Sequence, residues 1–562
     1  MLAGAAAAVH SMGNRSSGAA HERDASACIW RAVDAGDAHS LRAVLEAGST
    51  HTFCSSRRRR ARADGEEATA AAASSAASAV HVNCVNDTLR TPLHWAVHKG
   101  YAQIVALLLA HGADVRAVDV DRWTALHVAA VEGYAPIVRM LCTAHAPLEA
   151  GTREGWTPLI IAAASGHADV VRALVEYGAR LDASDVLQWT PLQHAASNNA
   201  TAAVQVLVDT GAPLETRARE GWTPLSSASA RGHTDIVTLL LQSGARVDAA
   251  NDAHWMPLHQ ASAGGHLASV HALVDACAPL DARTVEGWAP LTIAAASGHA
   301  EVVRLLLRCG AHVDEADAER WTPLVHAASS GHTACVRALL EAGARTQVHN
   351  AYGNSAVHLA AQNGHVRCLE VLLTAGECVN AAARNGHQPL HLATHMQHHN
   401  AVVYLLAMGA HVDARDQHEW TPLHVAAEHC AAALVLCLLR AGASLHAVTN
   451  NGWTPAHIAA QNSNIDALHE LIAAGADVSM RGGGGGWTAL HFAAHNDDVG
   501  SAQLLIRAHA STRAMGADGY TSLQVCHLLD TRAVADLLLA HGGAAMLSPS
   551  ACSDAQRAWL WD

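Results

Sequence analysis

The hexapeptide EGWTPL occupies Glu154–Leu159 and returns unchanged at Glu220–Leu225. It returns as EGWAPL at Glu286–Leu291 and as NGWTPA at Asn451–Ala456. Each copy places a Trp before a Thr-Pro or Ala-Pro pair, although the 562-residue chain holds only 2 Phe and 6 Tyr. The recurrence of so specific a segment indicates that the chain is built from repeats.

The position that follows this Trp recurs every 33 residues. It falls at Thr91, Thr124, Thr157, Thr190, Thr223, Met256, Ala289, Thr322, Ser355, Gln388, Thr421 and Thr454. Thr488 comes one residue late, after the run Gly482–Gly486, and Thr521 resumes the step, which makes fourteen repeats. A period of 33 with TPLH-like and Gly-His segments resembles the ankyrin-repeat family, over roughly Asn86–Met546.

A single repeat contains the signals for two short helices. Thr157 is a good N-cap and Pro158 suits the first helical turn, where its missing N–H costs nothing. Gly166 ends the first helix, and Val170 and Leu174 give the second an apolar face. Two such thin helices cannot bury a core alone, so the repeats must stack. We therefore expect an all-α solenoid, and the family resemblance adds β-hairpin fingers between repeats.

The ends and one interruption divide the chain further. We expect a disordered N-terminus at 1–23, an N-terminal capping half-repeat at 24–50, a disordered Arg-rich and Ala/Ser-rich insertion at 51–85, repeats at 86–546 and a tail at 547–562. The run Arg57–Arg62 fits a nuclear-import signal, a contact with a phosphate or an acidic partner, or a solvated loop.

A longer period of 66 residues lies within the shorter one. Repeats opening at Asp119, Asp185, Asn251 and Asp317 have no Gly before the Trp, whereas those opening at Thr152, Ala218 and Thr284 carry Glu-Gly-Trp. A surface built from this double unit repeats its chemistry at every second step.

The Trp position holds Trp in ten repeats. These are Trp123, Trp156, Trp189, Trp222, Trp255, Trp288, Trp321, Trp420, Trp453 and Trp487. The family resemblance implies that the position lies where the finger enters the first helix, on the concave side where partners commonly dock. Two interpretations are open: a structural ladder of indoles wedged on the next finger, or a row of aromatic anchors for a partner.

The surroundings favour partner binding for part of this row. Glu154, Glu220 and Glu286 stand two residues before Trp156, Trp222 and Trp288, and the last residues of the nearby first helices are mostly small. We predict that these six residues bind a partner, with further contacts from Trp123, Trp189, Trp255 and Trp321. Aromatic faces with periodic carboxylates suit an extended basic protein segment.

Histidine is abundant, with 41 residues in two recurring slots. One slot follows the Thr-Pro-Leu triplet and the other follows Gly, and we expect both to hydrogen-bond neighbouring loops. His391 and His395 lie one helical turn apart, with further histidines nearby, so they are weak candidates for a metal site or a pH sensor.

Composition and motifs restrict the function. The net charge of −14 argues against general nucleic-acid binding, no apolar run approaches membrane-spanning length, and the 13 Cys contain no CxxC pair. No catalytic motif is present, so we expect no enzyme, no cofactor and no small-molecule substrate. We expect a scaffold or adaptor in the cytoplasm, or also in the nucleus, with a substrate receptor of a ubiquitin ligase as the alternative.

Overall fold

The computed structural model describes residues 22–46, 82–429 and 431–542. The predicted disordered N-terminus at 1–23 and the C-terminal tail at 547–562 lie wholly or almost wholly outside these residues, as does the Arg57–Arg62 run. At the N-terminal side, helix α2 (Glu22–Asp34) is followed by a helical stretch at residues 38–46, where the capping half-repeat is expected.

The described residues contain fourteen successive helix pairs, which confirms the all-α repeat fold. The first helices are α4 (Pro92–His98), α6 (Ala125–Glu132), α8 (Pro158–Ser165), α10 (Pro191–Ser197), α12 (Pro224–Arg231), α14 (Pro257–Ala263), α16 (Pro290–Ala296), α18 (Pro323–Ser329), α20 (Ala356–Gln362), α22 (Pro389–His395), α24 (Pro422–Glu428), α26 (Pro455–Gln461), α28 (Ala489–His495) and α30 (Ser522–Leu529). The second helices are α5 (Ala102–Ala110), α7 (Ala135–Thr143), α9 (Ala168–Glu176), α11 (Thr201–Asp209), α13 (Thr234–Gln242), α15 (Leu267–Asp275), α17 (Ala300–Arg308), α19 (Thr333–Glu341), α21 (Val366–Thr374), α23 (His399–Ala407), α25 (Ala432–Arg440), α27 (Ile465–Ala473), α29 (Val499–Arg507) and α31 (Arg532–Ala540).

The helix boundaries lie where the capping signals predict them. Thr157 is the N-cap of α8, and its side chain accepts a hydrogen bond from the N–H of Ile160. Pro158 opens the helix, and Gly166 ends it in the left-handed conformation with φ 80°. In α9, Val170 and Leu174 are fully buried. Short-range signals therefore account for both ends of α8.

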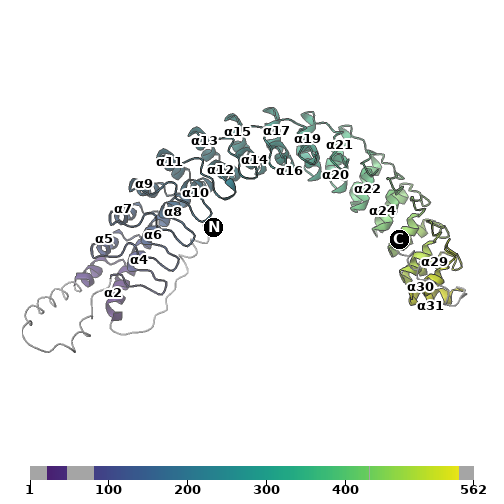
Figure 1. Ribbon diagram of the computed structural model, residues 1–562, viewed down its shortest axis with the longest axis horizontal. Helices are drawn as coiled ribbons and strands as arrows, with labels where there is room; N and C mark the ends of the chain where they lie inside the picture. Colours follow the sequence, from purple (N-terminus) through teal and green to yellow (C-terminus); the bar gives the residue numbers. More distant parts are fainter. Residues whose placement is uncertain (1–21, 47–81, 430, 543–562) are drawn as a thin grey trace, which may run out of the picture. The chain divides into compact units, whose positions relative to one another are not determined.

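The chain forms two compact units, one of residues 1–261 with 268–278 and one of residues 262–267 with 279–562. In the first unit α8 packs against α10 and α7 packs against α9; in the second, α16 packs against α18 and α17 against α19. Within each unit the first helices therefore form one row and the second helices another, as Figure 1 shows. The apolar side chains between them, including Leu159, Leu225 and Leu291, are about 1% exposed.

The fingers between repeats differ in detail from the β-hairpins that the family resemblance implies. In the described part of the chain the only β-bridges are Gly482 with Trp487 and Met515 with Thr521. The other fingers are turns: one N–H bonds across the tip, as from Asp185 to the carbonyl of Trp189, and another bonds along the stack to the preceding finger. Val186 N–H, for example, donates to the carbonyl of Glu154 at 3.1 Å. One finger contains a short 3₁₀ turn, η1 (Arg219–Gly221).

Candidate protein-binding face

Two versions of one turn hold the finger tips, and they explain the 66-residue period. In the Asp version, Asp185 Oδ1 accepts hydrogen bonds from the N–H groups of Leu187 and Trp189, at 2.8 and 2.9 Å. These two bonds stabilise the turn, so that Gln188, which is not a glycine, adopts the left-handed conformation with φ 62°. In the other version Thr152 and Thr284 form a single longer bond and Ala218 forms none, and glycine takes the left-handed position, as with Gly155 at φ 78° and Gly221 at φ 79°.

The backbone carbonyl at the Trp position accepts the hydrogen bonds that hold the finger in place. The carbonyl of Trp156 accepts hydrogen bonds from Thr152 N–H and from the ring of His127, each at 3.1 Å. The carbonyl of His387, which fills the same position in another repeat, accepts the equivalent bonds from Ala383 N–H and His358. The backbone carbonyl of any residue can accept these bonds, so the finger itself does not require an indole.

The indoles are neither fully buried nor fully exposed. All ten tryptophans of the row are partly buried, including those predicted to bind a partner: Trp123, Trp156, Trp189, Trp222, Trp255, Trp288 and Trp321. The three predicted carboxylates, Glu154, Glu220 and Glu286, are exposed and make no ion pair within the described residues. The face therefore offers indole edges with free carboxylates at the finger tips.

A histidine that the sequence analysis did not identify joins two of these indoles. The ring centroid of His194 lies 4.8 Å from that of Trp156 and 5.2 Å from that of Trp189. Its Nε2 meets Asp185 Oδ2 at 3.0 Å. Burial raises the pKa of Asp185, but hydrogen bonds from His194 and from two N–H groups outweigh it and lower the pKa overall.

The same cluster occurs once more in the second unit. His326 lies 4.6 Å from Trp288 and 5.0 Å from Trp321, measured between ring centroids, and its Nε2 meets Asp317 Oδ2 at 2.9 Å. Burial lowers the pKa of His326, although Asp317 opposes the effect. The signal in the sequence is a His one residue beyond the usual slot, as in PLQH and PLVH. Trp222 has Gln260 at the equivalent place and no ring contact within the described residues.

The usual histidine slot has the structural role that was expected. His127 Nδ1 accepts from the N–H of Thr124, and its Nε2 donates to the carbonyls of Ala150 and Trp156. Burial lowers the pKa of His127 to about 4, and the same cause lowers the pKa of His358 and of His424 to about 4. These rings are therefore neutral at neutral pH.

The second histidine slot bonds each repeat to the loop of the preceding one. The Nε2 atoms of His167, His233, His299, His332 and His365 each lie about 3.0 Å from a carbonyl oxygen 36 residues earlier. The ring also fills the space above a glycine: a Cβ on Gly133 would lie 2.8 Å from His167. Both slots therefore tie neighbouring repeats together.

The candidate metal ligands His391 and His395 are not brought together. His391 is about 1% exposed; its Nδ1 accepts from Gln388 N–H at 3.2 Å and its Nε2 donates to the carbonyl of Trp420 at 3.1 Å. His395 is exposed, with its ring edge against His429. Among the described residues no group of three His, Cys, Asp or Glu side chains could hold a metal ion.

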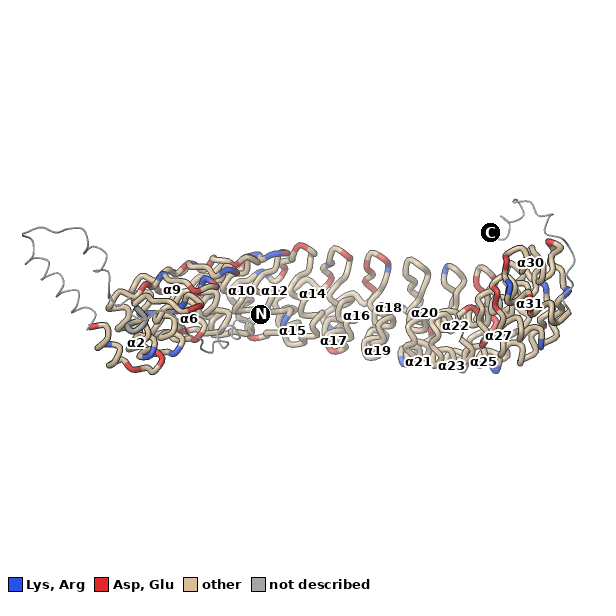
Figure 2. Tube along the Cα trace, turned by 90° about the horizontal axis from the view of Figure 1, so that it is seen from below, with Lys and Arg blue, Asp and Glu red and all other residues tan. Residues whose placement is uncertain are grey.

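The exposed residues at the ends of the first helices differ along the second unit. In the repeats of α16 and α18 the exposed end residues are Ser297 and Ser330. Further along, Asn363, Met396 and Asn462 are exposed at equivalent places. Figure 2 shows acidic and basic residues along the finger loops of both units.

One buried carboxylate departs from the repeat pattern. Glu377 stands where twelve other repeats carry Ala, and it is 8% exposed. Its Oε2 accepts a hydrogen bond from Ser355 Oγ at 3.1 Å, while Oε1 is buried without a partner. Burial raises the pKa of Glu377 to about 7, and the bond from Ser355 only partly opposes it.

Replacing Glu377 with Ala is expected to stabilise the second unit above neutral pH. The pKa is about 7 in the folded state and near 4.5 unfolded, so ionisation costs about 3 kcal/mol at high pH. Because the folded state holds the proton longer, the cost disappears as the pH falls from about 7 toward 4.5. Urea unfolding at about pH 8 and about pH 5 measures the gain, with exposed Glu370→Ala as the control. An equal gain at both pH values would contradict this account.

Comparison with known families agrees with the repeat structure. A family model described as ankyrin repeats (3 copies) matches residues 29–150, 116–185, 145–218, 182–251, 211–280, 258–350, 342–416 and 411–482. A second, described as ankyrin repeats (many copies), matches residues 459–506. A search of curated proteins finds no significant match. Within the described residues, no helix has the length and apolar character needed to cross a membrane.

Proposed function

Because the chain belongs to the ankyrin-repeat family, whose repeats are generally protein–protein interaction modules, we propose that it is a non-catalytic scaffold or adaptor. Its partner-binding face is the row of indoles at the fingers, centred on Trp156, Trp222 and Trp288.

At the Trp position the backbone holds the finger and the indole is not needed for it, which supports this proposal. The backbone makes the bonds that hold the finger: His387 and Tyr520 fill the same position with both bonds intact, and the carbonyl of Arg90 accepts from Asn86 N–H. Ten partly exposed indoles therefore exceed what the turn itself needs. Trp is enriched among residues that dominate binding energy, because it buries a large rigid surface.

The chemistry around the row favours an extended basic segment of a partner protein. Glu154, Glu220 and Glu286 recur every 66 residues and have no ion pair within the described residues. Beside them, the finger tips expose Val186 and Val285 by 61% and 68%. Aliphatic stems and cationic heads of Lys and Arg suit such a combination of apolar surface, indole and carboxylate.

A charge test distinguishes this face from the rest of the surface. Replacing Glu154, Glu220 and Glu286 with Gln is expected to weaken binding of an extended Arg/Lys-rich peptide by about 1–2 kcal/mol at low salt, and by less at high salt. The measurement is a calorimetric titration at two salt concentrations.

The chain provides a matched control for this change. Asp169, Asp235 and Glu301 are exposed, lie in the same three repeats and occur at the same spacing, but they open the second helices α9, α13 and α17. Neutralising them changes the net charge equally and is expected to leave the affinity nearly unchanged. Equal losses from both triple variants would show that only net charge matters and would refute the proposed face.

A further inference from the structure

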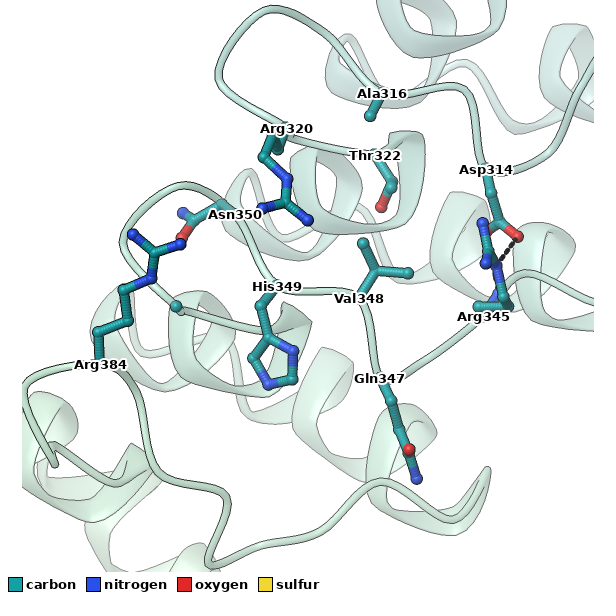
Figure 3. Close-up of a pocket in the computed structure, with 11 residues that line it drawn as sticks. Asp314, Ala316, Arg320, Thr322, Arg345, Gln347, Val348, His349, Asn350 and Arg384 are labelled. Carbon is teal, nitrogen blue, oxygen red and sulfur yellow. Dashed lines mark hydrogen bonds and ion pairs between the residues drawn. The ribbon is translucent and has the colours of Figure 1, made fainter.

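A cavity lies between the fingers of three consecutive repeats in the second unit. Its volume is about 410 Å³, and its lining includes Arg320, Arg345, Asn350 and Arg384 with Asp314 as the one carboxylate. A concentration of three guanidinium groups stands out in a chain with a net charge of −14. In Figure 3 the side chains of Arg320 and Arg384 point toward Asn350 from the neighbouring fingers.

Two of the three arginines have no acidic partner. Arg345 is engaged, because its Nε lies 2.9 Å from Asp314 Oδ2. Arg320 and Arg384 form no ion pair among the described residues. Arg320 adopts the left-handed conformation, with φ 64°, in a turn that Asp317 braces through the N–H groups of Glu319 and Trp321. The finger thus holds a charged residue at a position that favours glycine.

A buried donor without a partner faces the same cavity. Asn350 is 1% exposed, and its Oδ1 accepts from the N–H groups of Tyr352 and Asn354 at 3.0 and 2.9 Å. Those bonds fix the amide orientation, and its Nδ2 is buried with no hydrogen-bond partner. Buried polar groups are almost always paired, so an unpaired donor that lines a cavity indicates a missing acceptor.

Equivalent positions in other repeats show what kind of group is missing. Asp119 Oδ2 accepts from Arg90 at 3.1 Å, and Asp416 Oδ2 accepts from His387 at 3.2 Å. Each is a donor at the Trp position facing a carboxylate 29 residues later. The pair corresponding to these is Trp321 and Asn350, in which both groups are donors; Asn350 lines the cavity, and the nearby Trp321 Nε1 is also buried without a partner. An anionic oxygen is therefore absent where other repeats supply one.

We propose that this cavity binds the oxyanion of a phosphomonoester. Asn350 would donate one hydrogen bond, and the guanidinium groups of Arg320 and Arg384 would neutralise the charge. A phosphate dianion suits this set better than a carboxylate, because it has three terminal oxygens and up to two charges for the two free arginines. The cavity is larger than one phosphate group, which leaves room for the group that carries it.

The first test uses inorganic phosphate and the whole chain, at constant ionic strength. Titration calorimetry is expected to show binding to the wild type, and Arg320→Gln and Arg384→Gln are each expected to reduce the affinity about tenfold or more. Absence of phosphate binding by the wild type, or equal binding by both variants, would overturn the proposal.

Asn350→Asp is the most specific variant. It keeps the Oδ1 bonds of the turn, as Asp317 shows at the equivalent position, and places a carboxylate where the phosphate oxygen would lie. Phosphate binding is expected to disappear while the melting temperature rises. Asn251→Asp makes the same substitution at an equivalent turn away from the cavity and is expected to leave binding intact. Unchanged binding by Asn350→Asp would contradict the site.

A second titration identifies the source of the phosphomonoester. The probes are a degenerate phosphoserine peptide pool and its unphosphorylated counterpart. Tighter binding of the phosphoserine pool than of inorganic phosphate, lost in Asn350→Asp, would identify a phosphorylated side chain of a protein partner; this arm rests on the proposed scaffold function. Phosphate binding without that gain would identify a free small phosphomonoester. The inorganic-phosphate titration does not involve the indole row, so the phosphate site and the proposed indole face can each be refuted without the other.

Discussion

Acidification from about pH 7.5 to about pH 4.5 is expected to unfold the second unit, because several of its buried histidines must take up protons. His358 and His424 are fully buried, and burial lowers the pKa of each to about 4, against 6.5 in the unfolded chain. The unfolded state binds protons first as the pH falls below 6.5, so stability decreases through this window. At about pH 4.5 these two rings together cost about 5 kcal/mol, and burial also lowers the pKa of His391, His457 and His491.

That loss is comparable with the whole stability of a typical domain, about 5–15 kcal/mol. Glu377 acts in the opposite sense, because its raised pKa stabilises the folded unit as the pH falls from about 7. The histidines outnumber it, so the net effect remains acid destabilisation. Circular dichroism during a pH titration measures the midpoint.

A natural replacement in the first unit suggests the test variants. Gln193 occupies the histidine slot of its repeat: its Oε1 accepts from Thr190 N–H and its Nε2 donates to the carbonyls of Thr216 and Trp222. His358→Gln and His424→Gln should therefore keep the bonds without titrating. We expect nearly unchanged stability at neutral pH and a lower acid midpoint. Exposed His399→Gln is the control. An unmoved midpoint in the double variant would contradict this explanation.

The second large effect is expected in binding. Replacing Trp156, Trp222 and Trp288 with Ala should weaken an Arg/Lys-rich peptide by several kcal/mol, since indole anchors contribute about 2 kcal/mol or more each. The matched control is the triple replacement of Trp123, Trp189 and Trp255, which belong to the Asp version of the turn and lack the preceding Glu. It should weaken binding less, and titration calorimetry compares the two. A larger loss in the control would place the principal contacts on the other half of the row.

Much of the fold follows from local sequence. Thr157, Pro158 and Gly166 set the ends of one helix through short-range bonds, and copies of the same signals recur every 33 residues. The period therefore predicts which residues face a neighbour, including the role of His127 between loops. The finger turns were less predictable, because some of their N–H groups bond to the preceding finger.

The parts that sequence reasoning missed depend on contacts between adjacent repeats. His194 meets Trp156 only when two repeats are stacked, whereas its contact with Asp185 lies within one repeat, across nine residues. Asn350 and Trp321 are ordinary residues of their slots, and their burial in the folded stack leaves Asn350 Nδ2 and Trp321 Nε1 unsatisfied. Glu377 was detectable, since an acid replaces Ala at a position that the other repeats bury or partly bury.

The most direct test of the indole row compares two triple variants by thermal unfolding and by binding. Truncating Leu159, Leu225 and Leu291, each about 1% exposed, to Ala should cost about 2–5 kcal/mol of stability per residue. The triple variant of Trp156, Trp222 and Trp288 should unfold at a clearly higher temperature than the Leu variant, yet bind the basic peptide several kcal/mol more weakly than the wild type. If the Trp variant instead unfolds as readily as the Leu variant and binds normally while folded, the indoles are structural contacts between fingers and do not form a binding face.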